Sequence, residues 1–196
     1  DKNMSTNNST PQVNRSTPRY EVMFGVIPGE APPFRKYFQQ KDMFVEVKKD
    51  QRYEATLRVN GEDVQCIFQN DVGPSCEDRM WPLRLNAVFM CFHEEDAMNF
   101  IGVCSCLERY MERMPMLVPF ITNPLPPGSG NENIEGKLSE SYPTFFPYTR
   151  LPDDPAVAFQ LIEEQVYTVV ERFISDKEER EPPPRPVQKK DQCVVA

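Results

Sequence analysis

The dipeptide Asn60-Gly61, inside the stretch YEATLRVNGEDVQCIF (53–68), is the feature that most constrains the fold of this chain. A two-residue type I′ turn needs positive φ at both central positions, which Asn tolerates and Gly adopts without penalty. Apolar and polar residues alternate on both sides of the dipeptide. The pattern predicts a β-hairpin with its turn at Asn60-Gly61.

The alternation also predicts the register of this hairpin. If Val59 lies opposite Glu62, the pairing continues residue by residue until Tyr53 lies opposite Phe68. One face of the ladder then carries apolar side chains from both strands, and the other carries charged and polar pairs. Because an isolated hairpin is only marginally stable, another element must cover the apolar face.

Helical periodicity predicts three helices. A short one is expected over 34–41, and a longer one over 93–114, where apolar residues recur at helical spacing. The third covers 154–179, where Asp154 is a good N-cap and Pro155 a good first helical residue.

Three further segments read as strands. Alternation over 43–49 is typical of an edge strand, whereas 83–92 becomes continuously apolar and is expected in the sheet centre. The segment 116–122 is also extended, but Pro119 predicts a position at the sheet edge because proline cannot donate to a ladder.

These elements predict an α+β fold. We expect a small antiparallel or mixed sheet with the hairpin at 59–60/61–64, packed on one face by two amphipathic helices as a two-layer sandwich. A pleckstrin-homology-like strand meander closed by one helix is the alternative. The two-layer arrangement is favoured because the helix over 154–179 also needs a surface to cover.

Composition divides the chain into a single domain with two tails. Residues 1–19 are rich in Ser, Thr and Asn and predict a disordered tail, and 180–196 predict a charged, Pro-rich tail. The domain spans 20–179 and includes a flexible loop over 123–141, which is rich in Pro, Gly, Asn and Glu.

Charge and hydropathy exclude two classes of partner. The chain has a net charge of −8 and lacks the basic stripe expected of a nucleic-acid-binding protein. No apolar run approaches the roughly 20 residues of a membrane span.

Cys66, Cys91 and Cys104 fall on predicted apolar faces, where a free cysteine acts as a small hydrophobe. We therefore expect a cytoplasmic protein, with the nucleus as the alternative.

No catalytic, cofactor-binding or metal site is predicted. His93 is the only histidine, and no arrangement of nucleophile and base accompanies it. Cys91, His93, Cys104 and Cys106 could supply four zinc ligands. However, residues two apart on a helix point about 200° from each other, so Cys104 and Cys106 could not both face one ion.

The N-terminal tail carries candidate phosphorylation sites. Thr10 and Thr17 each lie in a Ser-Thr-Pro tripeptide, which suits a proline-directed kinase and, once phosphorylated, a phospho-motif reader. A polar disordered tail with no such role is the alternative.

The C-terminal tail carries two further motifs. Arg180, Pro183 and Pro186 match the +xxPxxP spacing of an SH3-domain ligand in a polyproline II helix. Cys193 begins a C-terminal C-a-a-X string of the kind that is farnesylated. A single prenyl chain anchors weakly, so at most transient membrane contact is expected.

Three classes of function remain open. We favour a non-enzymatic protein-interaction module or adaptor subunit, with phospho-regulated and Pro-rich motifs in its tails. An enzyme, or an enzyme's regulatory subunit, with a site that matches no motif is one alternative, and a lipid-surface adaptor is the other. Four aromatic residues could form an anchor patch for a partner or could cap the core: Tyr142, Phe145, Phe146 and Tyr148.

Overall fold

The computed structural model describes residues 17–27, 33–48, 51–70, 84–93, 97–122 and 134–180. In chain order its elements are β1 (Tyr20–Ile27), α1 (Pro33–Gln40), β2 (Val45–Lys48), β3 (Arg52–Val59), β4 (Glu62–Asn70), β5 (Ala87–His93), α2 (Ala97–Tyr110), β6 (Met116–Thr122), α3 (Ile134–Ser141), β7 (Thr149–Arg150) and α4 (Pro155–Arg180).

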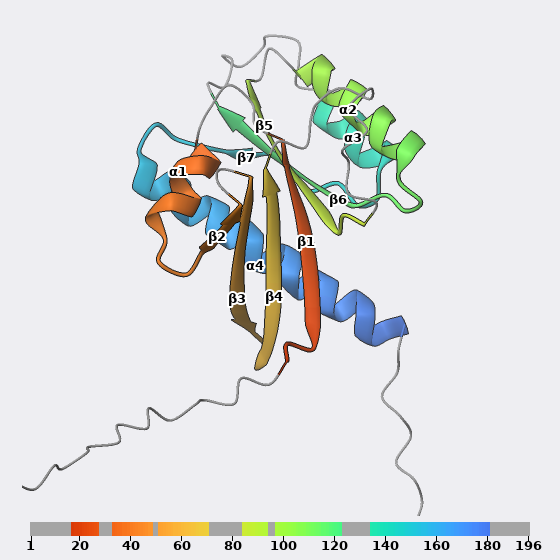
Figure 1. The fold of residues 1–196 in the computed structure, drawn as a ribbon. Helices are drawn as coiled ribbons and strands as arrows, with labels where there is room; N and C mark the ends of the chain where they lie inside the picture. Colours follow the sequence, from red (N-terminus) through yellow and green to blue (C-terminus); the bar gives the residue numbers. More distant parts are fainter. Residues whose placement is uncertain are drawn as a thin grey trace, which may run out of the picture.

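A seven-stranded mixed sheet organises the molecule, in the order β2-β3-β4-β1-β5-β6-β7 (Figure 1). β1 pairs in parallel with both β4 and β5, β5 with β6, and β6 with β7. β3 runs antiparallel to both of its neighbours, β2 and β4. The sheet is therefore mixed, as predicted, but larger than predicted.

The predicted hairpin is confirmed in its turn and its register. Val59 pairs with Glu62 and Tyr53 with Phe68, with each intermediate pair as expected. Asn60 has a φ of 51° and Gly61 a φ of 84°, so both adopt the left-handed conformation that the turn requires.

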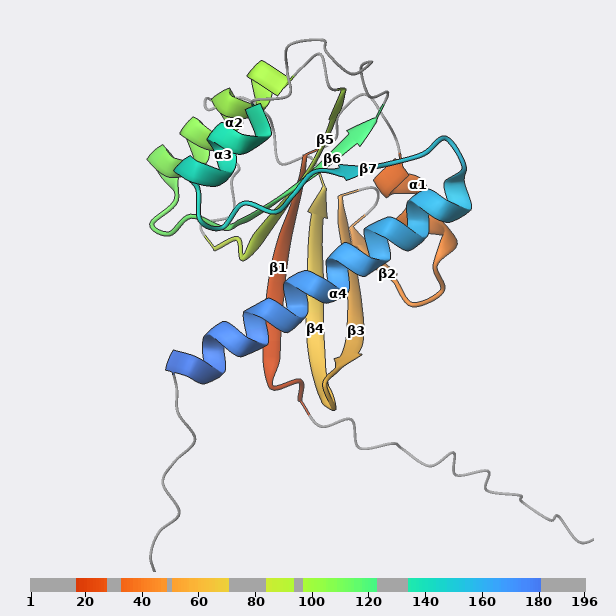
Figure 2. The ribbon, with the colours of Figure 1, turned by 180° about the vertical axis from the view of Figure 1, so that it is seen from behind.

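The helices cover both faces of the sheet. α4 crosses one face diagonally, with α1 beside its N-terminal half, while α2 and α3 lie together on the opposite face (Figure 2). The prediction of a two-layer sandwich with both long helices on one face is therefore wrong, and so is the strand meander closed by one helix. β5 and β6 are apolar on both faces, and each face needs its own helical layer.

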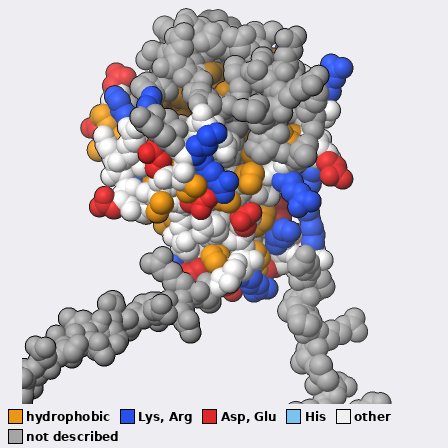
Figure 3. Space-filling model, in the orientation of Figure 1, with side chains coloured by type: hydrophobic (Ala, Val, Ile, Leu, Met, Phe, Trp, Pro, Cys, Tyr) orange, Lys and Arg blue, Asp and Glu red, His pale blue; other side chains and the backbone are white. Residues whose placement is uncertain are grey.

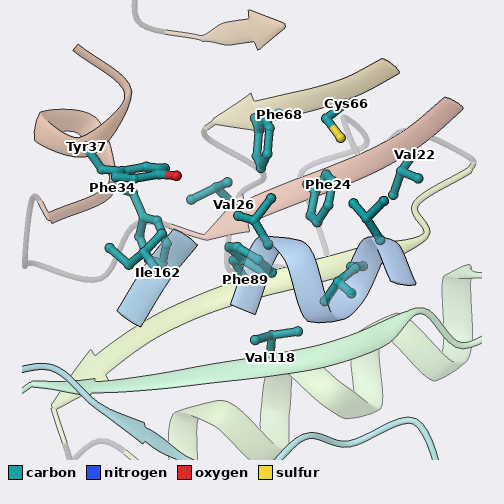
Figure 4. Packing of buried hydrophobic residues seen from close by; sticks show 14 of the residues in the cluster. Val22, Phe24, Val26, Phe34, Tyr37, Cys66, Phe68, Phe89, Val118 and Ile162 are labelled. Carbon is teal, nitrogen blue, oxygen red and sulfur yellow. The ribbon is translucent and has the colours of Figure 1, made fainter. Parts of the chain in front are cut away.

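The larger core lies under α4 and α1. Apolar side chains of β1, β4 and β5 meet Ile162 of α4 and Phe34 and Tyr37 of α1 (Figure 4). One side of α4 carries apolar residues at helical spacing, and all of these are buried: Phe159, Ile162, Val166, Val169, Val170 and Phe173. At the start of this helix the Asp154 Oδ1 accepts a hydrogen bond from the Ala156 backbone N–H at 2.9 Å, which confirms the predicted cap.

The second core lies under α2 and α3. Leu107, Phe100 and Cys104 of α2 pack against Val88 and Met90, the residues of β5 that point away from α4. The predicted loop over 123–141 is wrong in its last part, because residues 134–141 form α3. Leu138, 3% exposed, anchors this short helix in the second core, and this tertiary contact stabilises a segment with weak helical periodicity.

β6 lies inside the sheet, and the prediction that Pro119 confines it to an edge is wrong. Along the outer side of β6, Leu117 exchanges backbone hydrogen bonds with residues 144 and 146, and the Ile121 carbonyl accepts one from Leu151. Backbone groups of alternate residues in a strand face the same neighbour, so the nitrogen of Pro119 also faces the outer side. It lies between the isolated bridge at Leu117 and the pairing with β7. Its missing N–H falls where the pairing is interrupted, so no ladder bond is lost.

β1 is the central strand and was not predicted at all. Val22, Phe24 and Val26 alternate toward the α4 face. Met23 and Ile27 pack on the α2 face, which makes the strand's period hard to distinguish from that of a short buried helix.

Candidate functional site

A groove runs along the C-terminal end of α4 and consists of two adjoining cavities. The first, of about 170 Å³, is bounded by α4, the α2–β6 connection, the segment before β5, and Thr144. The second, of about 230 Å³, lies between α4 and the start of β1. Phe173 and Lys177 line both cavities, so we refer to the pair as the α4 groove.

Apolar packing fixes the wall of the α4 groove. The buried ring of Phe173 meets Tyr20 of β1 edge to face, with ring centroids 6.5 Å apart. On the other side, Asn86 joins three strands. It exchanges hydrogen bonds with the backbone of Met23 at 2.8 Å in each direction, and its carbonyl accepts one from the Met116 N–H at 2.9 Å. The middle of β1 is thereby held to the amino ends of β5 and β6 beside α4.

The first cavity has an excess of positive charge. It is lined by the cations Arg113, Lys177 and Arg180, against the single carboxylate of Asp176. None of these four side chains forms an ion pair within the part of the chain that the structure describes. Lys and Arg side chains gather beside the point where α4 ends (Figure 3). This local charge contrasts with the net charge of −8 for the whole chain.

A buried hydroxyl adds a polar group to the same cavity. The Thr144 Oγ1 is shielded from solvent and has no hydrogen-bond partner among the described residues. A buried hydroxyl without a partner is destabilising, by about 1–3 kcal/mol. Thr144 lines the first cavity, but its Oγ1 would have to become exposed before it could form a hydrogen bond with a ligand there.

A second exposed surface lies at the opposite end of the sheet. β2 is an edge strand, as predicted, and all four of its residues are exposed. Val45 is 64% and Val47 55% exposed, and Met43 just before the strand is also exposed. Val45 lies opposite Glu54, on the face of the sheet that points away from α4.

The neighbouring face of the β3–β4 hairpin is polar and internally paired. Arg58 and Asp63 form an ion pair at 3.0 Å, and the Thr56 hydroxyl donates to Gln65 at 3.0 Å. Glu54 accepts hydrogen bonds from Gln65 and from Arg52, at 3.3 and 2.9 Å. These groups satisfy one another across the strands, which leaves the valines of β2 as the apolar part of this surface.

The buried cysteines are chemically inert. Burial raises the pKa of the Cys66 thiol from its ordinary value of 9.0 to about 12, and the pKa values of Cys91 and Cys104 rise to about 12 for the same reason. The three are free thiols that pack in the two cores, as predicted for Cys66, Cys91 and Cys104. A thiol with such a pKa stays protonated at neutral pH and is a poor nucleophile.

The four residues considered as zinc ligands are not brought together in one core. Cys91 points to the α4 side of the sheet and Cys104 to the α2 side, while Cys106 is disulfide-bonded. His93 ends β5, and its side chain is not described. Within the described residues, no three His, Cys, Asp or Glu side chains are grouped so that they could hold a metal ion.

The tail motifs fall mostly outside the described residues. Thr10, Pro183, Pro186 and Cys193 lie there, so the phosphorylation, SH3-ligand and prenylation hypotheses that rest on them stay predictions. Thr17 is described and exposed, three residues before β1.

Arg180 has a different structural setting from the one expected of a polyproline ligand. It is the last residue of α4, it is exposed, and it lines the α4 groove. An SH3 ligand would need this residue in an extended polyproline II conformation, so the end of α4 would have to unwind.

The four aromatic residues divide between the two cores. Phe145 is buried in the core under α2, where it meets Phe100 edge to face, and Phe146 is buried in the core under α4. Tyr142 and Tyr148 are half-buried beside Phe145. The burial of both phenylalanines favours the interpretation that this segment caps the core.

The α4 groove was missed in the sequence because its members come from distant segments. Arg113, Thr144 and Lys177 are separated by three elements of secondary structure, and each is unremarkable in its local context. The one available signal was Lys177 and Arg180 one turn apart, which reads equally well as a favourable charge at a helix C-terminus.

Comparisons with known proteins give no further identification. No protein-family model matches the sequence, and no curated protein is significantly similar to it. Among the described residues, no helix is both long enough and apolar enough to span a bilayer.

Proposed function

We propose that this chain is a protein-interaction module that binds an extended segment of a partner protein along β2. The main evidence is the distribution of exposed apolar side chains. Met43, Val45, Val47 and Val157 are the large exposed hydrophobic residues of the described chain, and three of the four lie at β2. Their clustering on one edge strand is the kind of exposed apolar surface that marks an interaction site.

The backbone of β2 supports the same assignment. An edge strand presents a row of free N–H and C=O groups, and a partner strand gains main-chain hydrogen bonds by pairing with it. Specificity would come from alternate side chains of the added strand, which would contact Val45 and the polar ladder of the β3–β4 hairpin.

The state of the thiols favours binding over catalysis. An enzyme with a site that matches no motif would use a carboxylate or thiol with a pKa shifted toward its working pH. The shifts at Cys66, Cys91 and Cys104 go the other way and keep the thiols protonated. None of the three lines the α4 groove.

Peptide selection followed by amide hydrogen exchange tests the proposal. A displayed library of random peptides is selected on the full chain, and exchange rates are then measured with and without a selected peptide. We expect peptides that slow the exchange of β2 amides. We also expect Val45→Lys to abolish their binding, because a lysine on an edge strand opposes pairing.

Val157→Lys is the matched control, since Val157 is an exposed valine on α4. It should bind the peptides as the wild type does. Selected peptides that protect another surface, or that bind Val45→Lys unchanged, would refute a docking site at β2. Sedimentation of the two variants and the wild type separates a partner strand from a second copy of this chain, because only self-pairing would change the oligomeric state without peptide.

A further inference from the structure

We propose that the first cavity of the α4 groove is a binding site for a phosphomonoester group. Three cations line it from two elements: Arg113 from the α2–β6 connection, and Lys177 and Arg180 from α4. Thr144, from the segment before β7, lies in its wall with a shielded hydroxyl that has no partner among the described residues. This inference is independent of β2, which lies at the other end of the sheet.

The net charge of the residues that line the cavity favours a doubly charged anion. The three cations and Asp176 leave a local charge of +2, and the negative end of the α4 dipole offsets roughly half a unit of it. A carboxylate would neutralise only part of that charge. A phosphomonoester carries about −1.5 to −2 at pH 7 and accepts several hydrogen bonds.

The donors suit phosphate oxygens. Each guanidinium presents a fork of N–H groups that can bind two oxygens, and Lys177 supplies a compact ammonium. Lys177 is held over the ring of Phe173, with its Nζ 5.9 Å from the ring centroid. Neither arginine forms an ion pair within the described residues, so an arriving phosphate breaks no salt bridge among them.

The size of the cavity defines the ligand class. At about 170 Å³ it is smaller than the roughly 300–1,000 Å³ of sites that enclose a whole drug-sized ligand. It therefore has room for a phosphoryl group, while the remainder of the ligand would extend outward. The second cavity continues the groove toward the start of β1, where the charges are balanced: Arg19 and Lys177 face Glu21 and Glu178. Thr17 precedes this strand by three residues.

The test is a titration of the isotope-labelled full chain with inorganic phosphate, followed by backbone amide chemical shifts at pH 7.5 and constant ionic strength. We expect saturable shifts confined to residues 84–86, 113–116, 144 and 173–180. Acetate at the same ionic strength should give none. Shifts that do not saturate, or that acetate reproduces, would overturn the proposal.

Variants with opposite expected effects exclude general damage to the fold. Arg113→Ala and Lys177→Ala, both exposed positions, should each weaken phosphate binding by roughly tenfold or more. Asp176→Asn should tighten it, a gain that unfolding cannot produce. Lys137→Ala, an exposed lysine on α3, is the control and should bind as the wild type does. Wild-type affinity in both Arg113→Ala and Lys177→Ala would refute the site.

A second arm distinguishes the source of the phosphate. A peptide copying residues 12–18 with phosphorylated Thr17 is titrated in the same way. Binding at least tenfold tighter than that of inorganic phosphate supports a site for phosphothreonine, whereas equal binding supports a site for a small phosphorylated molecule. If neither ligand binds, the cavity is not a phosphate site.

Discussion

At the scale of single residues, the turn of the β3–β4 hairpin is held by two positive φ angles, 51° at Asn60 and 84° at Gly61. A Cβ added at Gly61 would meet no atom within 4 Å, so the cost of a side chain there comes from the backbone alone. We expect Asn60→Ala with Gly61→Val to destabilise the protein by about 2 kcal/mol or more, because neither replacement tolerates this conformation.

Urea unfolding measures this effect, and Asn60→Gly is its control. Glycine adopts positive φ freely, so that variant should unfold close to the wild-type midpoint. An unchanged midpoint for the double variant would contradict the assigned turn.

The thiol of Cys66 couples stability to pH. Its pKa is raised from 9.0 in the unfolded chain to about 12 in the folded protein because it is buried in β4. Above pH 9 the unfolded state loses a proton that the folded state retains, so the free energy of unfolding falls as pH rises. Each such thiol contributes up to about 1.4 kcal/mol per pH unit between pH 9 and 12.

We expect Cys66→Ala to reduce this slope by the contribution of one thiol. Urea unfolding at pH 8, 9 and 10, under reducing conditions, measures it. Val64→Ala, a buried position on the same face of β4, is the control. It should lower stability at every pH while keeping the wild-type slope. The same slope in Cys66→Ala and Val64→Ala would rule out the coupling.

At the scale of elements, α4 depends on a single side-chain cap. The hydrogen bond from the Ala156 N–H to Asp154 satisfies one of the free donors in the first helical turn. We expect Asp154→Ala to lower the free energy of unfolding by about 1 kcal/mol. Asp153→Ala removes a neighbouring exposed carboxylate and should change stability little. Equal losses in the two variants would show that charge, and not the cap, is responsible.

α2 is attached to the sheet through one buried face. Leu107 is 1% exposed and lies in the core under α2. We expect Leu107→Ala to cost about 2–5 kcal/mol, through lost burial and the cavity left behind. Ser105→Ala, at an exposed position on the same helix, should cost far less. A loss below about 0.5 kcal/mol in Leu107→Ala would contradict the packing of α2, and thermal or urea unfolding decides it.

At the scale of the whole molecule, α4 provides the helical cover for much of the larger core. It buries eight residues, most of them large and apolar, and each large side chain contributes roughly 1.5–3 kcal/mol. Together these burial contributions are as large as, or larger than, the about 5–15 kcal/mol of net free energy by which a domain of this kind is stable. We therefore expect a chain ending at Asp154 to show no cooperative unfolding transition.

A chain ending at Arg180 is the matched control for that truncation, because it retains α4 complete. It should unfold cooperatively near the wild-type midpoint. Circular dichroism during heating distinguishes the two chains. A cooperative transition in the shorter chain would show that the remaining layers fold without α4.

The sequence alone determined the local structure of this protein. The positive φ required at Asn60 and Gly61 specified the turn, and the alternation around it specified the register. Helical periodicity located α1 and α4, and Asp154 marked the start of α4. It also located α2, but the predicted range of 93–114 was too long, because His93 ends β5 and 111–114 are not helical. Each of these features depends on residues close together in the chain, so local propensity and side-chain period are sufficient to reveal it.

Only the tertiary structure decided how these elements combine. Parallel pairing places β1 between β4 and β5, and the two-sided burial of β5 and β6 then requires a helical layer on each face. The same packing brings Arg113, Thr144 and Lys177 together around one cavity. Such contacts join residues far apart in sequence, so no local pattern records them. Pro119 is tolerated inside the sheet for a related reason, since its neighbours determine where a missing hydrogen bond falls.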